Sequence, residues 1–62
     1  MNMEEEFKLE GFTVSFQKKG GHLSGFVKEI PQCRADSSDM LTFRMELRAA
    51  ISEYIVANAF SK

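Results

Sequence analysis

The spacing of the apolar residues changes once along this chain, and that change constrains the fold more than any other feature. In the segment "GFTVSFQKK", Phe12, Val14 and Phe16 alternate with polar residues, which predicts a half-buried strand. From Asp39 onward, apolar residues recur every three or four positions, as they do along one side of an amphipathic helix. The sequence therefore predicts strands first and a helix last.

A pair of glycines marks a tight turn after the first predicted strand. Gly20 and Gly21 supply the positive φ angles that short hairpins require, so the segment "HLSGFVKEI" should return antiparallel to the first strand. Within that second strand, Gly25 favours either a close backbone approach or a bulge.

The chain before Gly11 is harder to assign. Phe7 and Leu9 also alternate with polar residues, but in the parity opposite to that of the first predicted strand. A bulge at Gly11 would bring the two sets of apolar residues onto the same face. The alternative is that the residues before Gly11 form a short, separate edge segment. We expect residues 1–6, "MNMEEE", to be disordered because they are polar and terminal.

The segment "EIPQCRADSSDM" joins the two periodicities. Pro31 fixes its own φ and holds the preceding residue extended, and a short third strand fits around Cys33 to Ala35. Asp39 is a good N-cap, because its carboxylate can accept a backbone N–H at the positive end of a helix. We expect the helix to run to about Ala59.

One apolar stripe follows that predicted helix. Its members are Phe43, Leu47, Ala50, Ile51, Tyr54 and Ile55. A stripe of this width packs on one face of a sheet. The predicted fold is a single α+β domain over residues 1–62, with a three-stranded antiparallel sheet (β-β-β-α) and one C-terminal helix on one face.

The small size of the chain predicts self-association. A domain of 62 residues buries only about 60% of the surface that its unfolded chain exposes, so its stability is marginal without further support. The single cysteine cannot form an internal disulfide. Met45, Val56 and Phe60 lie off the main helical stripe, and we expect them to form the interface of a homodimer or a higher oligomer.

Charge and hydropathy exclude some classes of partner. The net charge is −1 and the sequence pI is about 5.7, so strong DNA binding is not expected. No apolar run approaches the roughly 20 residues that span a bilayer, and the acidic start of the chain does not look like a signal peptide. A cytoplasmic protein that does not bind membranes is expected.

The candidate catalytic groups favour a structural interpretation. His22, the sole histidine, lies at the opposite end of the second predicted strand from Cys33, so a nucleophile–base pair would require the sheet to bend back on itself. Carboxylates such as Asp36 and Glu29, at turns and strand ends, are more often caps than metal ligands. We expect neither a metal nor a cofactor, and no enzymatic activity.

Two segments carry a resemblance to a known family: "FVKEIPQC", and "RAAISEYI" in the predicted helix. They resemble the HicB-like antitoxins of bacterial toxin–antitoxin systems, whose N-terminal domain is a partial RNase-H-like fold. The matching positions are Phe26, Glu29, Ile30, Pro31, Cys33, Ala50, Ile51 and Tyr54. Gln32 stands where family members have glycine, and Leu41–Thr42 replace acidic residues early in the helix.

This resemblance implies a protein-binding function. HicB-like antitoxins neutralise small basic ribonucleases of the HicA type by covering them, so the acidic residues Glu4, Glu5, Glu6 and Glu29 become candidate partner contacts. On this view Gly20, Gly21, Pro31, Cys33 and Asp39 are structural. Many family members bind DNA through a further C-terminal segment, for which we expect no room before Lys62. The alternatives are a structural or regulatory homo-oligomer without a toxin and, last, a residual nuclease, for which the strands lack carboxylates.

Overall fold

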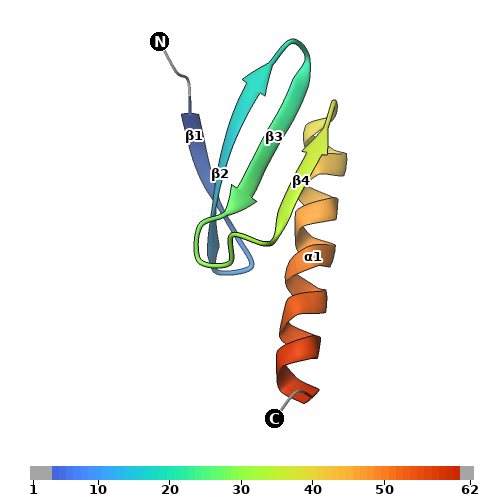
Figure 1. Ribbon diagram of the computed structural model, residues 1–62. Coiled ribbons are helices and arrows are strands. Elements are labelled where there is room, and N and C mark those ends of the chain that lie inside the picture. The colour runs from blue at the N-terminus through green and yellow to red at the C-terminus, as the bar shows by residue number, and fades with distance from the viewer. Residues whose placement is uncertain (1–3, 61–62) are drawn as a thin grey trace.

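Four antiparallel strands form one sheet, and a single long helix follows them (Figure 1). The computed structural model describes residues 4–60. Its elements are β1 (Glu4–Leu9), β2 (Phe12–Lys19), β3 (His22–Val27), β4 (Arg34–Ser37) and α1 (Met40–Phe60). The strands lie in the order β1-β2-β3-β4, each paired with its neighbour along the chain. The α+β class is therefore confirmed, but the sheet has four strands where the sequence predicted three.

The additional strand is β1, which is the separate edge segment predicted as the alternative to a bulge at Gly11. Glu10 and Gly11, with φ angles of 53° and 84°, form a two-residue turn that pairs Leu9 with Phe12. Residues 4–6 are not frayed, because Glu4, Glu5 and Glu6 pair with Gln17, Phe16 and Ser15 of β2. Residues 1–3, also predicted to be disordered, lie outside the described part of the chain.

The second hairpin turn agrees with the sequence. Gly20 and Gly21 have φ angles of 56° and 80°, and they connect Lys19 to its partner His22. Positive φ at both central positions matches the right-handed twist of the flanking strands. This turn sets the register of β2 and β3, in which Phe16 lies opposite Gly25.

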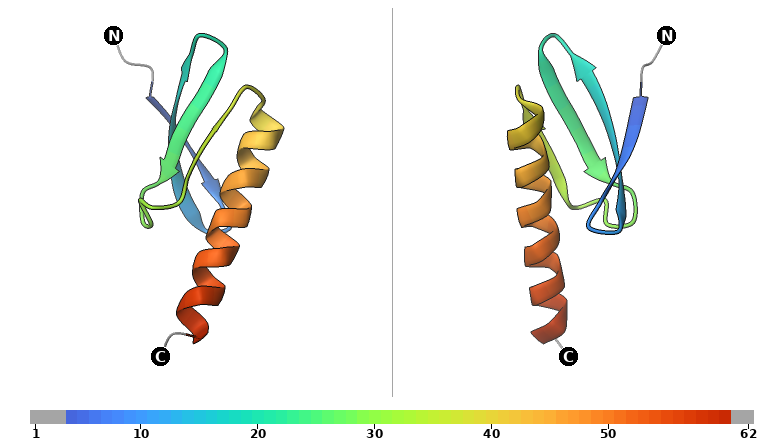
Figure 2. Two further views of the ribbon diagram at one scale, coloured as in Figure 1. Left: turned by 45° about the vertical axis from the view of Figure 1, so that its right-hand side comes forward. Right: turned by 180° about the vertical axis from the view of Figure 1, so that it is seen from behind.

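The pairing register sorts the side chains onto two faces, because directly opposed residues of a sheet point to the same side. One face carries the apolar residues of the first three strands except Phe26, and α1 packs on it (Figure 2). The buried core consists of Leu9, Val14, Phe16, Leu23, Val27, Ile30, Cys33, Phe43, Leu47 and Ile51. The C-terminal turns of α1 extend beyond the end of the sheet (Figure 2), so part of the helix has no sheet beneath it.

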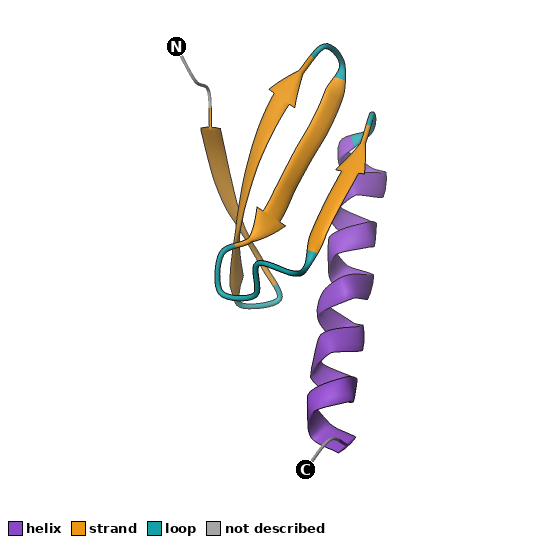
Figure 3. Ribbon diagram, in the orientation of Figure 1, coloured by secondary structure: helices purple, strands orange, loops and turns teal. Residues whose placement is uncertain are grey.

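A tight joint connects β3 to β4 and contains the proline and the cysteine (Figure 3). The backbone N–H of Cys33 donates to the carbonyl of Ile30 over 2.8 Å, and the N–H of Val27 donates to the carbonyl of Cys33 over 2.9 Å. Ile30 and Cys33 are both buried, whereas Pro31 is exposed at the turn. The strand after the joint begins at Arg34, one residue later than predicted.

The helix begins where the sequence predicted it. The carboxylate of Asp39 accepts hydrogen bonds from the backbone N–H of Thr42 over 2.9 Å and from its hydroxyl over 3.1 Å. This arrangement satisfies one of the N–H groups that a helix leaves unpaired in its first turn. The helix ends at Phe60, next to the predicted end at Ala59.

Candidate binding surfaces

The residues with catalytic potential are kept apart by the fold. His22 opens β3 at the exposed hairpin end, whereas Cys33 lies beyond the other end of that strand and is 3% exposed. Burial, and to a lesser extent the charge of Glu53, raises the pKa of the Cys33 thiol, which disfavours the reactive thiolate. Nδ1 of His22 instead lies 3.5 Å from Oδ1 of Asp36, and both side chains are largely in solvent.

The four carboxylates predicted to contact a partner do not form one acidic surface. Glu4 and Glu6 share the open face of the sheet, whereas Glu5 lies opposite Phe16 and so points to the helix side. The Glu6 carboxylate accepts a hydrogen bond from Nζ of Lys28 over 2.8 Å. That hydrogen bond and the charge of Glu6 raise the pKa of Lys28.

Glu29 has an internal structural contact. Its carboxylate accepts a hydrogen bond from the backbone N–H of Thr13 over 2.9 Å, which ties the joint to the start of β2. This hydrogen bond is the main reason that the pKa of Glu29 is lowered from its ordinary value. A carboxylate that accepts a hydrogen bond from an otherwise unpaired backbone N–H of a strand typically acts as a local cap. One oxygen of the exposed Glu29 carboxylate is therefore already engaged within the chain.

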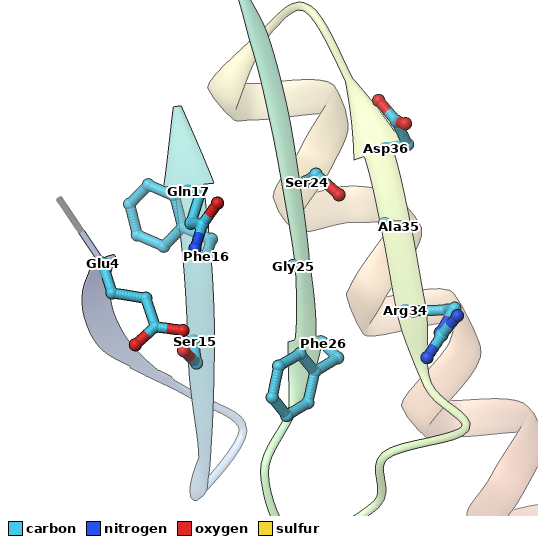
Figure 4. A pocket seen from close by; sticks show the side chains of 10 residues that line it. All are labelled: Glu4, Ser15, Phe16, Gln17, Ser24, Gly25, Phe26, Arg34, Ala35 and Asp36. Atoms are coloured by element: carbon cyan, nitrogen blue, oxygen red, sulfur yellow. The ribbon is translucent and has the colours of Figure 1, made fainter. Parts of the chain in front are cut away.

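The open face of the sheet contains a shallow depression of about 530 Å³ (Figure 4). Small residues form its floor, and the side chains of Glu4, Gln17, Phe26, Arg34 and Asp36 stand around it. The floor comprises Ser15, Ser24 and Gly25. Both signs of charge are present at the rim, because Glu4 and Asp36 are acidic and Arg34 is basic.

The aromatic residues of the strands do not form a base-stacking platform. Phe16 is buried on the helix side, with its ring centroid 5.8 Å from that of Phe43, and Phe12 also packs against the core. Phe26 instead faces the depression on the open side of the sheet. The phenylalanines of the strands therefore serve mainly the core.

All the large hydrophobic side chains that are exposed in the described part of the chain lie on α1: Met40, Leu41, Met45, Ile55 and Val56. Met45 and Val56, predicted to lie at an interface, are 58% and 50% exposed. Ile55, which the helical spacing assigned to the core stripe, is 51% exposed. Phe60 lies in the last turn of α1, and its side chain is outside the described residues.

A groove of about 590 Å³ runs along the outer side of α1. Its lining residues are Glu10, Met45, Arg48, Ala49, Ile51, Ser52, Ile55 and Val56. Arg48 is positioned at the rim by its Nε–H, which donates to the Glu10 carboxylate over 2.7 Å. The sequence signal for this surface was present in a second series, spaced by four, three and four: Met45, Ala49, Ser52 and Val56.

Within residues 4–60, no three or more His, Cys, Asp or Glu side chains come together as metal ligands would. No helix in that range combines the length and the apolar content needed to cross a bilayer.

Comparison of the chain with protein-family models, with curated proteins and with solved structures finds no match. The surfaces described above are therefore the basis for assigning a function.

Proposed function

We propose that this protein acts by binding another protein and catalyses no reaction. The observation that carries the proposal is the outer side of α1, where Met45, Ile55 and Val56 are each about half exposed and lie beside one groove. Large apolar side chains that gather on the surface of a small domain mark an interaction site more often than isolated ones do. The chemistry that would support an enzyme is weak in comparison, since the one buried thiol and the one imidazole are separated by the length of β3.

The class of partner that the sequence favours is a small basic ribonuclease of the HicA type. Support comes from the resemblance of the "FVKEIPQC" and "RAAISEYI" segments to HicB-like antitoxins, and from a fold in which a β-hairpin precedes the amphipathic helix. The open sheet face, with Glu4 and Asp36 at its rim, is the surface we assign to such a partner. A regulatory homo-oligomer without a toxin is the alternative, and the apolar side of α1 favours it.

The test measures inhibition of a purified HicA-type ribonuclease on labelled RNA. We expect this protein to suppress cleavage stoichiometrically, and the association to slow as salt screens the acidic contacts. Replacing Glu4 and Asp36 together by glutamine and asparagine should weaken the inhibition, whereas Lys19→Gln at the hairpin end serves as the matched control.

Three results would contradict the proposal. If the ribonuclease is not inhibited at any ratio, the antitoxin assignment is wrong, although protein binding through α1 would remain. If this protein alone cleaves RNA in the presence of magnesium or manganese, and the activity follows it through purification, the non-catalytic assignment is wrong. Tight sequence-specific binding to duplex DNA would indicate a repressor instead.

A further inference from the structure

Two apolar series run along opposite sides of α1. The buried series, which includes Phe43 and Leu47, contacts the sheet. At about 100° per residue, the second series lies on the side of the helix that faces away from the sheet. Its members, all exposed, are Met45, Ala49, Ser52 and Val56. Alternating steps of four and three place them at the a and d positions of a heptad, which is the pattern of a helix that pairs with another helix.

The charged residues beside this outer series are sorted by sign. On the helical wheel, Arg44 and Arg48 follow one border of the series, and Glu46 and Glu53 follow the other. All four side chains are exposed. The arginine border faces β1, since the Arg44 guanidinium lies 5.4 Å from the centroid of the Phe7 ring and Arg48 pairs with Glu10. One helix thus presents an apolar strip with a basic side and an acidic side.

The opposite charges of the two borders determine which partner this apolar strip can bind. A strip with a basic border and an acidic border is complementary to a copy of itself when the two helices run parallel about a two-fold axis, because each basic border then meets an acidic one. In an antiparallel two-fold pair, arginines would face arginines and glutamates would face glutamates, which is unfavourable.

We infer that the outer side of α1 binds a second copy of this chain in a parallel, in-register helix pair. In this arrangement Met45, Ala49, Ser52 and Val56 each meet the same residue of the second copy. Arg48 reaches Glu53 of the second copy, five positions further along, as g and e residues do in parallel coiled coils. The inference rests on the proposed function only in taking this surface as a protein-binding site, and it does not depend on a toxin.

The surrounding structure is compatible with such a pair. Because the outer series faces away from the sheet, the two helices can meet while both sheets remain on the outside of the dimer. The small side chains of Ala49 and Ser52 at the middle of the series allow the helices to approach closely. The guanidinium of Arg48 has five N–H donors, and only Nε–H is engaged with Glu10 here, so it can bind a second carboxylate.

The first experiment is sedimentation equilibrium of the purified chain from micromolar to submillimolar concentration. We expect a species of twice 7.1 kDa. Arg48→Glu alone and Glu53→Arg alone should each weaken dimerisation about tenfold, because like charges then face each other at two sites. An equimolar mixture of the two variants should recover the dimer, since every facing pair is again of opposite sign. Glu10→Gln is the matched control, since it removes the neighbour of Arg48 without changing the helix surface.

Orientation is tested by cross-linking in a Cys33→Ser background. Met45→Cys should form a disulfide-linked dimer on mild oxidation, because a parallel pair places the two copies of position 45 against each other. Asn58→Cys, on another side of α1, should not. Circular dichroism and a melting curve establish that each variant is folded before it is compared.

A wild-type chain that remains monomeric at submillimolar concentration overturns the inference. A dimer in which the Met45→Cys variant fails to cross-link, or in which the charge-reversed mixture does not recover, also overturns it. Loss of ribonuclease inhibition with the dimer intact would instead refute only the antitoxin assignment.

Discussion

Replacing Gly25 by alanine should destabilise the fold through a clash between neighbouring strands. Gly25 of β3 faces Phe16 of β2 on the helix side of the sheet. A Cβ atom at position 25 would lie 2.6 Å from Cβ and 2.8 Å from Cα of Phe16, and it would also meet the carbonyl oxygen of Ser15. These atoms belong to the backbone or are attached directly to it, so the strands would have to separate.

The cost can be set against the stability of the whole domain. Overpacking of this kind costs about 1–3 kcal/mol, and contacts with rigid atoms place this case near the upper end. Alanine also lowers the conformational entropy of the unfolded chain, which offsets less than about 1 kcal/mol of this cost. We therefore expect the free energy of unfolding to fall by about 2 kcal/mol. A chain of 62 residues is typically stable by about 3–9 kcal/mol. The variant should fold but lose a large share of its stability.

Urea denaturation followed by circular dichroism measures this loss. With a slope of about 1 kcal/mol per molar urea for a domain of this size, the midpoint should fall by about 2 M. Ser24→Ala is the matched control, because Ser24 is next to Gly25 on β3 but exposed on the opposite face, and its midpoint should stay close to that of the wild type. An unchanged midpoint for Gly25→Ala would refute the argument that the strands approach too closely for a Cβ atom.

Three further predictions concern single side chains. Cys33→Ala should lower the free energy of unfolding by about 1–2 kcal/mol because the side chain is buried. The wild-type thiol should react slowly with iodoacetamide at neutral pH, because burial raises its pKa. Fast alkylation of the folded protein would contradict this. Asp39→Ala should cost about 1 kcal/mol in the same urea assay because Thr42 loses its capping carboxylate, whereas Asp39→Asn should cost less. Glu29 has a lowered pKa in the folded state, so its contribution to stability is complete above the unfolded value near 4.5 and is lost as the pH falls through the folded value. Glu29→Gln should therefore show a smaller loss of stability on acidification than the wild type, and an identical pH profile would disprove the role assigned to the Thr13–Glu29 hydrogen bond.

Local spacing predicted the middle and the end of this fold well. The alternation of Phe12, Val14 and Phe16 marked β2, and the paired glycines marked the turn to β3. Asp39 marked the start of α1 because capping depends on residues only three positions apart. Signals of this kind are local, so a single sequence contains them.

The first strand was predicted only as an alternative, a short edge segment, although its signal was present. When a hairpin turn has two residues, the residues directly before and after the turn lie opposite each other and on the same face of the sheet. Leu9 and Phe12 form such a pair. The apolar residues must therefore change from odd positions before Gly11 to even positions after it. The three consecutive glutamates obscured the strand, because glutamate is depleted in strands and an acidic terminus usually remains in solvent.

The surfaces were less predictable than the elements. Which carboxylates stay free depends on contacts between distant residues, such as Glu6 with Lys28, and no local pattern encodes them. The exposure of Ile55 depends on how α1 is placed against the sheet, which helical spacing does not specify.

The sequential order of the strands has a kinetic consequence. Strands that are neighbours in the sheet are also neighbours along the chain, so the strand pairings require no long loop to close. Only the packing of α1 on the sheet joins distant segments, as the Arg48–Glu10 contact shows. Rates of folding rise as contacts become more local, because less chain entropy is lost before each contact forms. We expect the chain to refold in a single exponential phase within about milliseconds, faster than β-sandwich proteins of equal stability. A refolding phase of seconds in stopped-flow fluorescence, with Tyr54 as the probe, would show that a step other than strand pairing controls the rate.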